Sequence, residues 1–184
     1  MRAMRVIAGA AKGRRLVGPD TRNTRPLTDR VREAVFSSLA DKVVGARVLD
    51  LFAGSGSIGI EALSRGADHA VFVENGRQAL SALRQNLAAV GFDNHLVVAE
   101  TVEQYLARAS SLFDLIFFDP PWTMPQSEVE TLLAVAGRLA APRAQLVLHR
   151  RQADPEPDPG PEWRHVTTRR YGDGKIYRYE KEAS

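Results

Sequence analysis

Apolar residues along the chain occur in two patterns, short continuous runs and helical spacings. Short runs rich in branched and aromatic residues are typical of strands buried on both faces of a sheet. Apolar residues three and four positions apart predict helices with one buried face. The runs predict strands over 47–52, 70–74, 95–99, 113–118 and 144–148. The spacings and their flanking residues predict helices over 29–39, 60–65, 77–90, 102–106 and 128–139.

The carboxyl-terminal pattern is different. Trp163–Tyr171 and Lys175–Glu180 flank Gly172-Asp173-Gly174, a turn sequence that favours a β-hairpin. Strands that alternate with helices indicate a parallel sheet with crossover helices. The sequence therefore predicts an α/β fold with a mainly parallel sheet and an antiparallel C-terminal hairpin at one edge.

The first part of the chain is strongly basic. Residues 4–17 predict two short strands around a Gly-containing turn, a small N-terminal β-hairpin. Residues 1–32 carry a net charge of +7, and the rest of the chain carries −4. A basic arm on a mildly acidic body favours a polyanionic partner, although a solvated surface is the alternative. The cations expected to contact RNA phosphates are Lys12, Arg14, Arg15, Arg25 and Arg30.

Length and composition narrow the class of protein. We expect a basic arm over residues 1–26 and one main domain over residues 27–184. Cysteine is absent, which excludes a disulfide framework, a thiolate nucleophile and a cysteine-type zinc site, and no metal site is predicted. No segment is apolar enough for a signal peptide or a membrane span, so we expect a cytoplasmic protein.

A glycine-rich loop follows the first strand of the main domain. Gly54, Gly56 and Gly59 fit the dinucleotide-binding pattern, and Glu74 lies 20 residues after Gly54, which alone would suggest NAD. Asp50 favours S-adenosylmethionine instead, because a carboxylate repels a pyrophosphate but attracts the ammonium of a methionine group. No constellation for hydride transfer is visible either.

Acidic residues also end the second and third strands. Glu74 is expected to bind the ribose hydroxyls. Glu100 and Thr101 are expected near the adenine, with helix capping as the equally good alternative for Thr101. The residues expected to bind the cofactor are Asp50, Phe52, Gly54, Ser55, Gly56, Glu74, Asn75, Glu100 and Thr101.

Asp119-Pro120-Pro121-Trp122 follows directly after the strand predicted over 113–118. Successive prolines end a strand, because they have no backbone N–H for the ladder. The Asp119 carboxylate and the Pro120 carbonyl suit the two hydrogens of an exocyclic amine. Trp122 suits stacking on the ring, a contact worth ~1–3 kcal/mol. The sequence therefore predicts amine methylation at the carboxyl end of a central strand, with catalytic residues Asp119, Pro120, Pro121 and Trp122. His149 is expected to lie at the rim, because no nucleophile or metal ligand lies near it in the sequence.

With these segments in view, the chain resembles the RsmD family of class I methyltransferases. The resemblance covers nearly the whole chain and is most specific at Arg25–Glu33, Leu49–Gly56, Glu61–Gly66 and Asp119–Pro121. It implies a seven-stranded Rossmann-like sheet and S-adenosylmethionine as methyl donor. It also implies methylation of N2 of a guanine, at position 966 in standard numbering, in 16S ribosomal RNA of the small (30S) subunit or its assembly intermediate.

Two positions depart from the family pattern. Trp122 stands where the family usually has Phe or Tyr, and Leu27 stands where it often has Thr. Neither departure removes a catalytic group. We expect the protein to be a monomer. Several alternatives stay open at this stage: an adenine-N6 methyltransferase acting on DNA or RNA, a glutamine-N5 protein methyltransferase, an NAD-dependent oxidoreductase, and a non-catalytic RNA-binding assembly factor.

Overall fold

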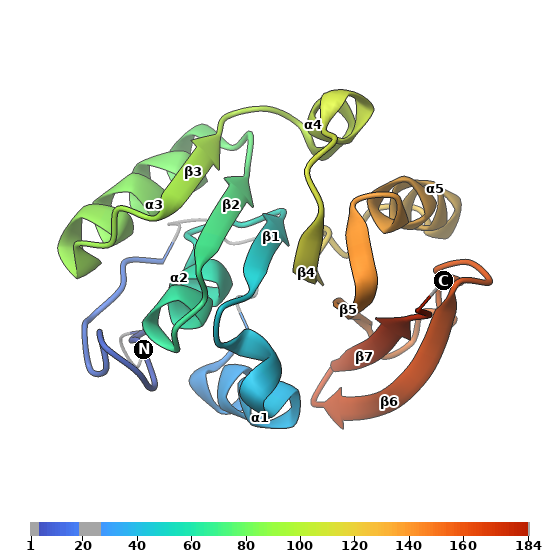
Figure 1. Ribbon diagram of the computed structural model, residues 1–184, viewed down its shortest axis with the longest axis horizontal. Helices are drawn as coiled ribbons and strands as arrows, with labels where there is room; N and C mark the ends of the chain where they lie inside the picture. The colour runs from blue at the N-terminus through green and yellow to red at the C-terminus, as the bar shows by residue number, and fades with distance from the viewer. Residues whose placement is uncertain (1–3, 19–26, 184) are drawn as a thin grey trace.

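The computed structural model describes residues 4–18 and 27–183. Within these residues seven strands form one sheet in the order β3-β2-β1-β4-β5-β7-β6 (Figure 1). Strands β1 to β5 run parallel, and β7 pairs antiparallel with β5 and with β6. The strands are β1 (Arg47–Leu51), β2 (His69–Val73), β3 (His95–Val98), β4 (Phe113–Phe118), β5 (Ala140–Arg151), β6 (Trp163–Tyr171) and β7 (Gly174–Lys181). The predicted seven-stranded, mainly parallel sheet with an antiparallel hairpin is confirmed.

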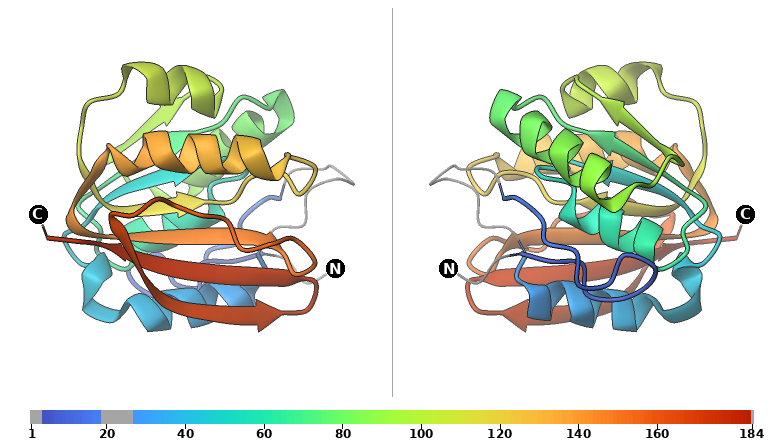
Figure 2. Two further views of the ribbon diagram at one scale, coloured as in Figure 1. Left: turned by 90° about the vertical axis from the view of Figure 1, so that its right-hand side faces the viewer. Right: turned by 90° about the vertical axis from the view of Figure 1, so that its left-hand side faces the viewer.

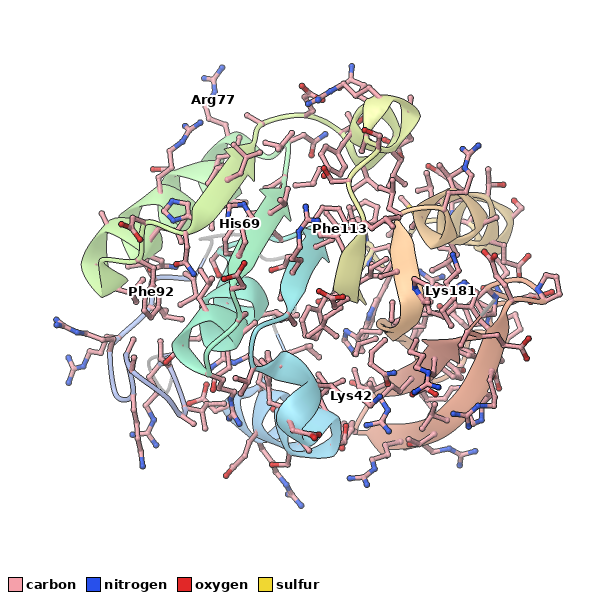
Figure 3. All side chains as sticks on the ribbon, viewed as in Figure 1. Lys42, His69, Arg77, Phe92, Phe113 and Lys181 are labelled. Atoms are coloured by element: carbon pink, nitrogen blue, oxygen red, sulfur yellow. The ribbon has the colours of Figure 1, made fainter. Side chains whose placement is uncertain are left out.

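Helices cover both faces of the sheet. They are α1 (Asp29–Leu39), α2 (Ser57–Ser64), α3 (Arg77–Val90), α4 (Val102–Arg108) and α5 (Gln126–Gly137), with a 3-10 turn η1 (Ala40–Val43). Apolar side chains of α1, α2 and α3 form one core cluster, and those of α4 and α5 form another. Figure 2 shows α1 and α5 on opposite sides of the sheet. Figure 3 shows Phe113 of β4 in the interior and Arg77 pointing outward from α3.

Local signals fix the ends of two helices where the sequence predicts them. Thr28 precedes α1, and its hydroxyl accepts a hydrogen bond from the Val31 N–H at 3.4 Å. Gly91 ends α3 in the left-handed conformation at φ 76°, with its N–H bonded to the Leu87 carbonyl. Both helices have the predicted bounds, 29–39 and 77–90.

Strand β5 begins earlier than predicted, at Ala140 and not at 144. Pro142 argues against an earlier start on the pattern alone, because proline cannot donate to a ladder. The structure accommodates it at an irregularity, where Arg143 has φ 63° and the register with β4 shifts. A bulge of this kind depends on the neighbouring strand, which a local pattern does not contain.

The described N-terminal residues are docked on helix α2. The buried Glu61 carboxylate accepts the Ile7 N–H at 2.7 Å and the Ala8 N–H at 3.1 Å. The Ser64 hydroxyl accepts the Ala11 N–H at 2.9 Å. Gly9 has φ 82°, and a Cβ there would lie 1.7 Å from the Ser64 carbonyl oxygen. Glu61 and Ser64 belong to the segment Glu61–Gly66, on which the family resemblance rests. Docking of the N-terminal residues explains why the segment contains these two side chains.

The predicted N-terminal hairpin is reduced to one antiparallel bridge pair, Arg5 with Arg15. Its apolar residues Val6, Ala11 and Leu16 are buried in the same cluster as α1, α2 and α3. The division at residue 26 stays a prediction, because residues 19–26 lie outside the described part. Within the described residues, no helix has the length and apolar character needed to cross a membrane.

Candidate active site

Five parallel strands, β3, β2, β1, β4 and β5, have their carboxyl ends at the same edge of the sheet. From β1 the chain continues toward β2 and β3, whereas β4 continues toward β5, so the connections diverge between β1 and β4 (Figure 1). Ligands of open α/β sheets bind at this kind of switch point. The predicted cofactor and amine residues come from the loops at this edge.

The loop after β1 has a strained, compact backbone. Phe52 has φ 61°, Gly54 φ 58° and Gly56 φ 80°. The left-handed conformation costs a residue with a side chain ~1–2 kcal/mol, so Phe52 stores strain at the start of the loop. A Cβ on Gly56 would lie 2.3 Å from the Leu83 side chain, whereas a Cβ on Gly54 would meet nothing within 4 Å. Gly56 is therefore required for packing, and Gly54 faces open space in which a ligand can approach the backbone.

Asp50 lies buried beneath this loop, 1% exposed. Its Oδ2 accepts the Gly59 N–H at 3.0 Å, within the first turn of α2. Its Oδ1 has no hydrogen-bond partner among the described residues. Burial raises the pKa of Asp50 to about 7, and the nearby Asp119 and Glu74 add to the rise, while the Gly59 hydrogen bond opposes it. A cationic ligand group near Oδ1 would stabilise the ionised form.

Glu74 connects the ends of β1 and β2. Its Oε2 accepts the Gly54 N–H at 2.8 Å, and its Oε1 accepts the N–H groups of Asn75 and Gly76 at 3.0 and 2.7 Å. The carboxylate thus holds the glycine loop in place and remains partly exposed. Asn75 is exposed, and Ser55 is buried with its carbonyl bonded to the Asn86 side chain at 2.9 Å.

Residues after β3 are engaged in local contacts. Thr101 caps α4, where its hydroxyl accepts the Gln104 N–H at 3.2 Å and completes a capping box. Glu100 forms two hydrogen bonds with Arg108, at 2.9 and 3.1 Å. The capping alternative for Thr101 is therefore confirmed. The contact of Glu100 and Thr101 with adenine stays a prediction.

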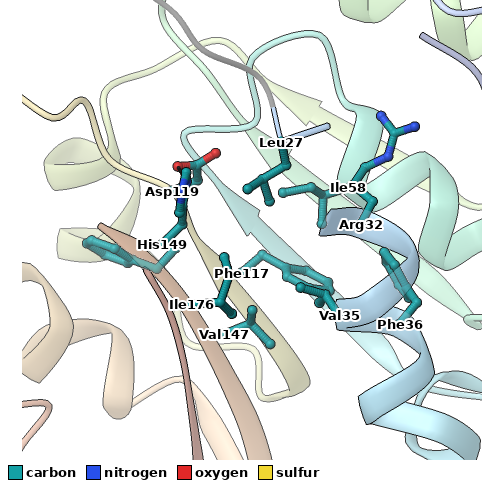
Figure 4. Close-up of a pocket in the computed structure, with 11 residues that line it drawn as sticks. Leu27, Arg32, Val35, Phe36, Ile58, Phe117, Asp119, Val147, His149 and Ile176 are labelled. Carbon is teal, nitrogen blue, oxygen red and sulfur yellow. Dashed lines mark hydrogen bonds and ion pairs between the residues drawn. The ribbon is translucent and has the colours of Figure 1, made fainter. Parts of the chain in front are cut away.

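Asp119 is paired with His149, and this pairing is absent from the sequence-based expectations. His149 Nδ1 lies 2.8 Å from Asp119 Oδ1 (Figure 4). An ionised carboxylate can only accept, so Nδ1 carries the hydrogen of this bond. His149 is 7% exposed and lines the pockets on both sides of Asp119, so it is more buried than a rim residue is expected to be. The register between β4 and β5 explains the pairing. Phe118 pairs with Leu148, so the next residue of each strand, Asp119 and His149, lie side by side.

The two residues after His149 also hold the loop that begins at Asp119. The buried Arg150 guanidinium donates to the carbonyls of Pro121 at 3.3 Å and Met124 at 3.1 Å. Arg151 lies over the Trp122 ring, 5.8 Å from its centroid. The Trp122 and His149 rings contact each other, with centroids 5.7 Å apart and an angle of 66° between their planes. The end of β5 therefore fixes the shape of this acceptor loop, residues 119–124.

The acceptor loop leaves suitable groups free for a substrate. Asp119 keeps 25% of its side chain exposed despite the bond to His149. Pro120 is buried, and its carbonyl accepts no hydrogen bond from the described residues, in contrast to the Pro121 carbonyl. Leu27 lies close to Asp119 in the same narrow pocket (Figure 4). A carboxylate, a free carbonyl and an aromatic ring are thus available together.

The predicted RNA-binding cations do not all lie together. Lys12, Arg14 and Arg15 are exposed on the N-terminal segment, which docks near Ser64 at the C-terminal end of α2. The glycine loop lies at the other end of that helix, ~12 Å away for eight residues. Arg30 is exposed at the start of α1 and lines a groove with Trp122. Arg25 lies outside the described residues.

No group of three or more metal-ligating side chains is found in the part of the chain that the structure describes. The acidic residues of the site instead bond to backbone N–H groups or to His149. The site geometry thus combines a glycine loop, two acids at adjacent strand ends and an acceptor loop.

Comparison with known proteins places this geometry in a family. A family model described as "Conserved hypothetical protein 95" matches residues 4–180. The Ribosomal RNA small subunit methyltransferase D of Haemophilus influenzae is 31% identical over 156 residues, 83% of this chain and 81% of that protein. The chain belongs to the RsmD family. The resemblance inferred from the motifs is confirmed.

A further relative and a solved structure extend the comparison. Ribosomal RNA small subunit methyltransferase D of Escherichia coli is 43% identical over 119 residues, and the match covers 65% of this chain and 60% of that protein. The solved structure of the Escherichia coli yhhF protein has a TM-score of 0.87 and 34% identity, covering 98% of this chain and 99% of that one. The class I methyltransferase fold is thereby confirmed, and S-adenosylmethionine is the cofactor of this class.

Proposed function

We propose that this chain transfers a methyl group from S-adenosylmethionine to the exocyclic N2 of a guanine in the RNA of the small ribosomal subunit, acting as a monomer. The observation that carries the proposal is Asp119, fixed by His149 beside Trp122 at the switch point of the sheet. The names of the relatives support ribosomal RNA as the substrate. The target at position 966 of 16S RNA, in the 30S subunit or its precursor, follows from the family resemblance.

The residues present fit the cofactor. Gly54 leaves room for close approach of a ligand to the backbone, and the buried Asp50 Oδ1 lacks a partner among the described residues. Asp50 would hold the methionine ammonium, and Glu74 the ribose hydroxyls, while keeping its bond to the Gly54 N–H. When bound, S-adenosylmethionine supplies an activated methyl group on a sulfonium.

The chain's own residues orient the amine. A guanine N2 is a weak nucleophile, because its lone pair is delocalised into the ring. Asp119 accepts one amine hydrogen and the Pro120 carbonyl accepts the other, which turns the lone pair out of conjugation. Trp122 stacks on the base. Positioning is the main catalytic device here, and Asp119 need not be a strong base, since the nitrogen becomes far more acidic once the N–C bond has formed.

Transfer of labelled methyl groups tests the proposal. The substrates are 30S subunits lacking the modification, protein-free 16S RNA and duplex DNA, with Asp119→Ala as the control. We expect N2-methylguanosine from the ribosomal RNA, and a loss of ~100–1,000-fold in kcat for Asp119→Ala, comparable to loss of one preorganised polar group in other active sites. Cofactor binding by the variant should be unchanged within a few fold.

The product identifies which alternative holds if the proposal is wrong. Recovery of N6-methyladenosine would show that the target base is adenine and that the same site methylates it. Label in protein would indicate a glutamine substrate. No transfer to any substrate, with S-adenosylmethionine still raising the melting temperature, would support a non-catalytic RNA-binding factor.

A further inference from the structure

A groove of about 350 Å³ opens beside the acceptor loop. Trp122 and His149 lie at its border with the active site. One wall is the start of α1, with Thr28 and Arg30, and the other is the turn between β6 and β7, residues 170–174. The function proposed above uses only the Trp122 end. The remainder of the groove has no role in holding the target amine or the cofactor.

The groove is lined by cations from two distant parts of the chain. Arg30 and Arg170 are both exposed and line the same space from the two walls. The hairpin wall also contains one exposed acid, Asp173, which has an interaction of its own, so among the described residues two arginines line the groove against one carboxylate. Arg151 adds a third exposed cation over Trp122. Asp29, beside Arg30, is already paired with the buried Arg32 at 2.8 Å. Guanidinium groups bind phosphate oxygens through paired N–H donors, so this arrangement suits a phosphate.

The wall formed by the hairpin turn is tied to the active site. Gly174 packs against His149 so closely that a Cβ would lie 2.5 Å from Nε2. Gly172 has φ 57°, and a Cβ there would meet nothing within 4 Å, so the turn presents bare backbone to the groove. Tyr171, half-buried in the same wall, adds an aromatic ring. The turn therefore presents the Gly172 backbone, the Tyr171 ring and the Arg170 guanidinium next to His149, which is bonded to Asp119.

We propose that this groove binds the sugar and phosphate of the nucleotide next to the target guanine in a single-stranded RNA segment, with Arg30 and Arg170 on its phosphate oxygens. The proposal rests on the proposed function, because Trp122 then marks the target base. A volume of about 350 Å³ lies at the lower end of small-ligand sites, ~300–1,000 Å³, and suits about one nucleotide. The hairpin turn is then a second RNA contact, separate from Lys12, Arg14 and Arg15.

Charge reversal at neighbouring positions of β6 tests the proposal. Arg170→Glu removes the groove cation, and Arg169→Glu is the matched control, because Arg169 is the preceding residue, is also exposed, and does not line the groove. We expect a rise of ~10-fold or more in the KM for RNA with Arg170→Glu, because the charge reversal replaces attraction to the phosphate by repulsion. The Kd for S-adenosylmethionine should be unchanged, and Arg169→Glu should stay within about threefold of wild type.

Salt dependence gives a second measurement. The slope of log(kcat/KM) against log salt should become shallower by ~0.7 for each single-strand phosphate that the variant no longer neutralises. Arg170→Lys should retain the slope while losing part of the affinity, because a lysine keeps the charge but not the paired donors. Equal effects of Arg169→Glu and Arg170→Glu on the KM for RNA would refute RNA binding in the groove. Such a result would reflect the overall positive charge of the hairpin.

The two proposals fail in different ways. If wild-type product is N6-methyladenosine, the target base is wrong, but a selective effect of Arg170→Glu on RNA binding still supports the groove. If the product is N2-methylguanosine and Arg170→Glu leaves the RNA KM unchanged, the function stands and the groove is refuted. Binding of a short labelled RNA, measured without methyl transfer, separates the two cases directly.

Discussion

At the scale of the residue, His149 shows how one side chain can set the chemistry of another. It donates to Asp119 at 2.8 Å, its ring contacts the Trp122 ring, and it leaves no room for a side chain at Gly174. A carboxylate fixed by one oxygen presents its other oxygen in a defined direction. In the proposed reaction, His149 is therefore a positioning residue for Asp119, and it does not need to touch the substrate.

Removal of that donor should lower turnover more than binding. His149→Leu keeps the approximate volume but loses the hydrogen bond to Asp119, and we expect kcat to fall ~10–100-fold, the equivalent of a hydrogen bond to a charged group. His149→Asn places an N–H donor near the Nδ1 position and should recover most of the loss. The measurement is kcat and KM for both substrates. Equal activity of the Asn and Leu variants, or a defect confined to KM, would argue against positioning.

At the scale of the element, the N-terminal segment depends on close backbone contact with α2. Gly9 and Gly13 both have positive φ, 82° and 86°, so an alanine at either position carries the same conformational strain. Only at Gly9 does a Cβ collide, 1.7 Å from the Ser64 carbonyl oxygen, and at Gly13 nothing lies within 4 Å. Comparing alanine variants at Gly9 and Gly13 therefore separates the effect of docking on α2 from the conformational strain of a positive φ.

We expect Gly9→Ala to destabilise the fold by ~3 kcal/mol or more, because the collision of the new Cβ with the Ser64 carbonyl breaks the hydrogen bonds to Glu61 and Ser64. Gly13→Ala should cost only ~1 kcal/mol, the strain of the left-handed region. Urea unfolding measures both values, and proteolysis within residues 4–18 reports undocking. Similar costs for the two variants would mean that the segment contributes little to stability.

Elements were easier to predict than contacts between them. Helices α1 and α3 and strand β4 have the predicted bounds, since their apolar spacing and capping residues are local. Helix α2 starts at Ser57 and not at 60, because the left-handed Gly56 begins it directly. Asp119, Trp122 and the glycine loop were visible as motifs. His149, Arg150 and Asn86 were not, because their partners come from other strands and helices through register and packing.

At the scale of the whole molecule, the buried Asp50 couples stability to pH. Its pKa is raised to about 7 in the fold, against an ordinary value of 3.8. Between these values the folded protein holds a proton that the unfolded chain has lost. The contribution of Asp50 to the free energy of unfolding therefore decreases as pH rises from about 4 to about 7, and the decrease is complete above pH 7.

Asp50→Asn should remove this dependence. The uncharged amide can still accept the Gly59 N–H, so we expect the variant to be more stable than wild type above pH 7, by up to about 4 kcal/mol for a pKa displaced from 3.8 to about 7. At pH 4 the two proteins should be similar. Thermal unfolding across pH 4–8 without cofactor measures the effect, and a constant difference at all pH values would contradict it. Affinity for S-adenosylmethionine should fall in the variant if Asp50 holds the ammonium.

The order of the strands has a consequence for how the protein is made. Strand β6 lies at the end of the sheet and pairs with β7, which follows it in the chain and lies between β6 and β5. During synthesis β6 therefore emerges before the strand that connects it to the sheet. The glycine loop and the strands around it can assemble earlier. On a nascent chain the residues proposed to hold the cofactor would thus come together first, and the turn at residues 170–174, the wall proposed to contact RNA, would form late.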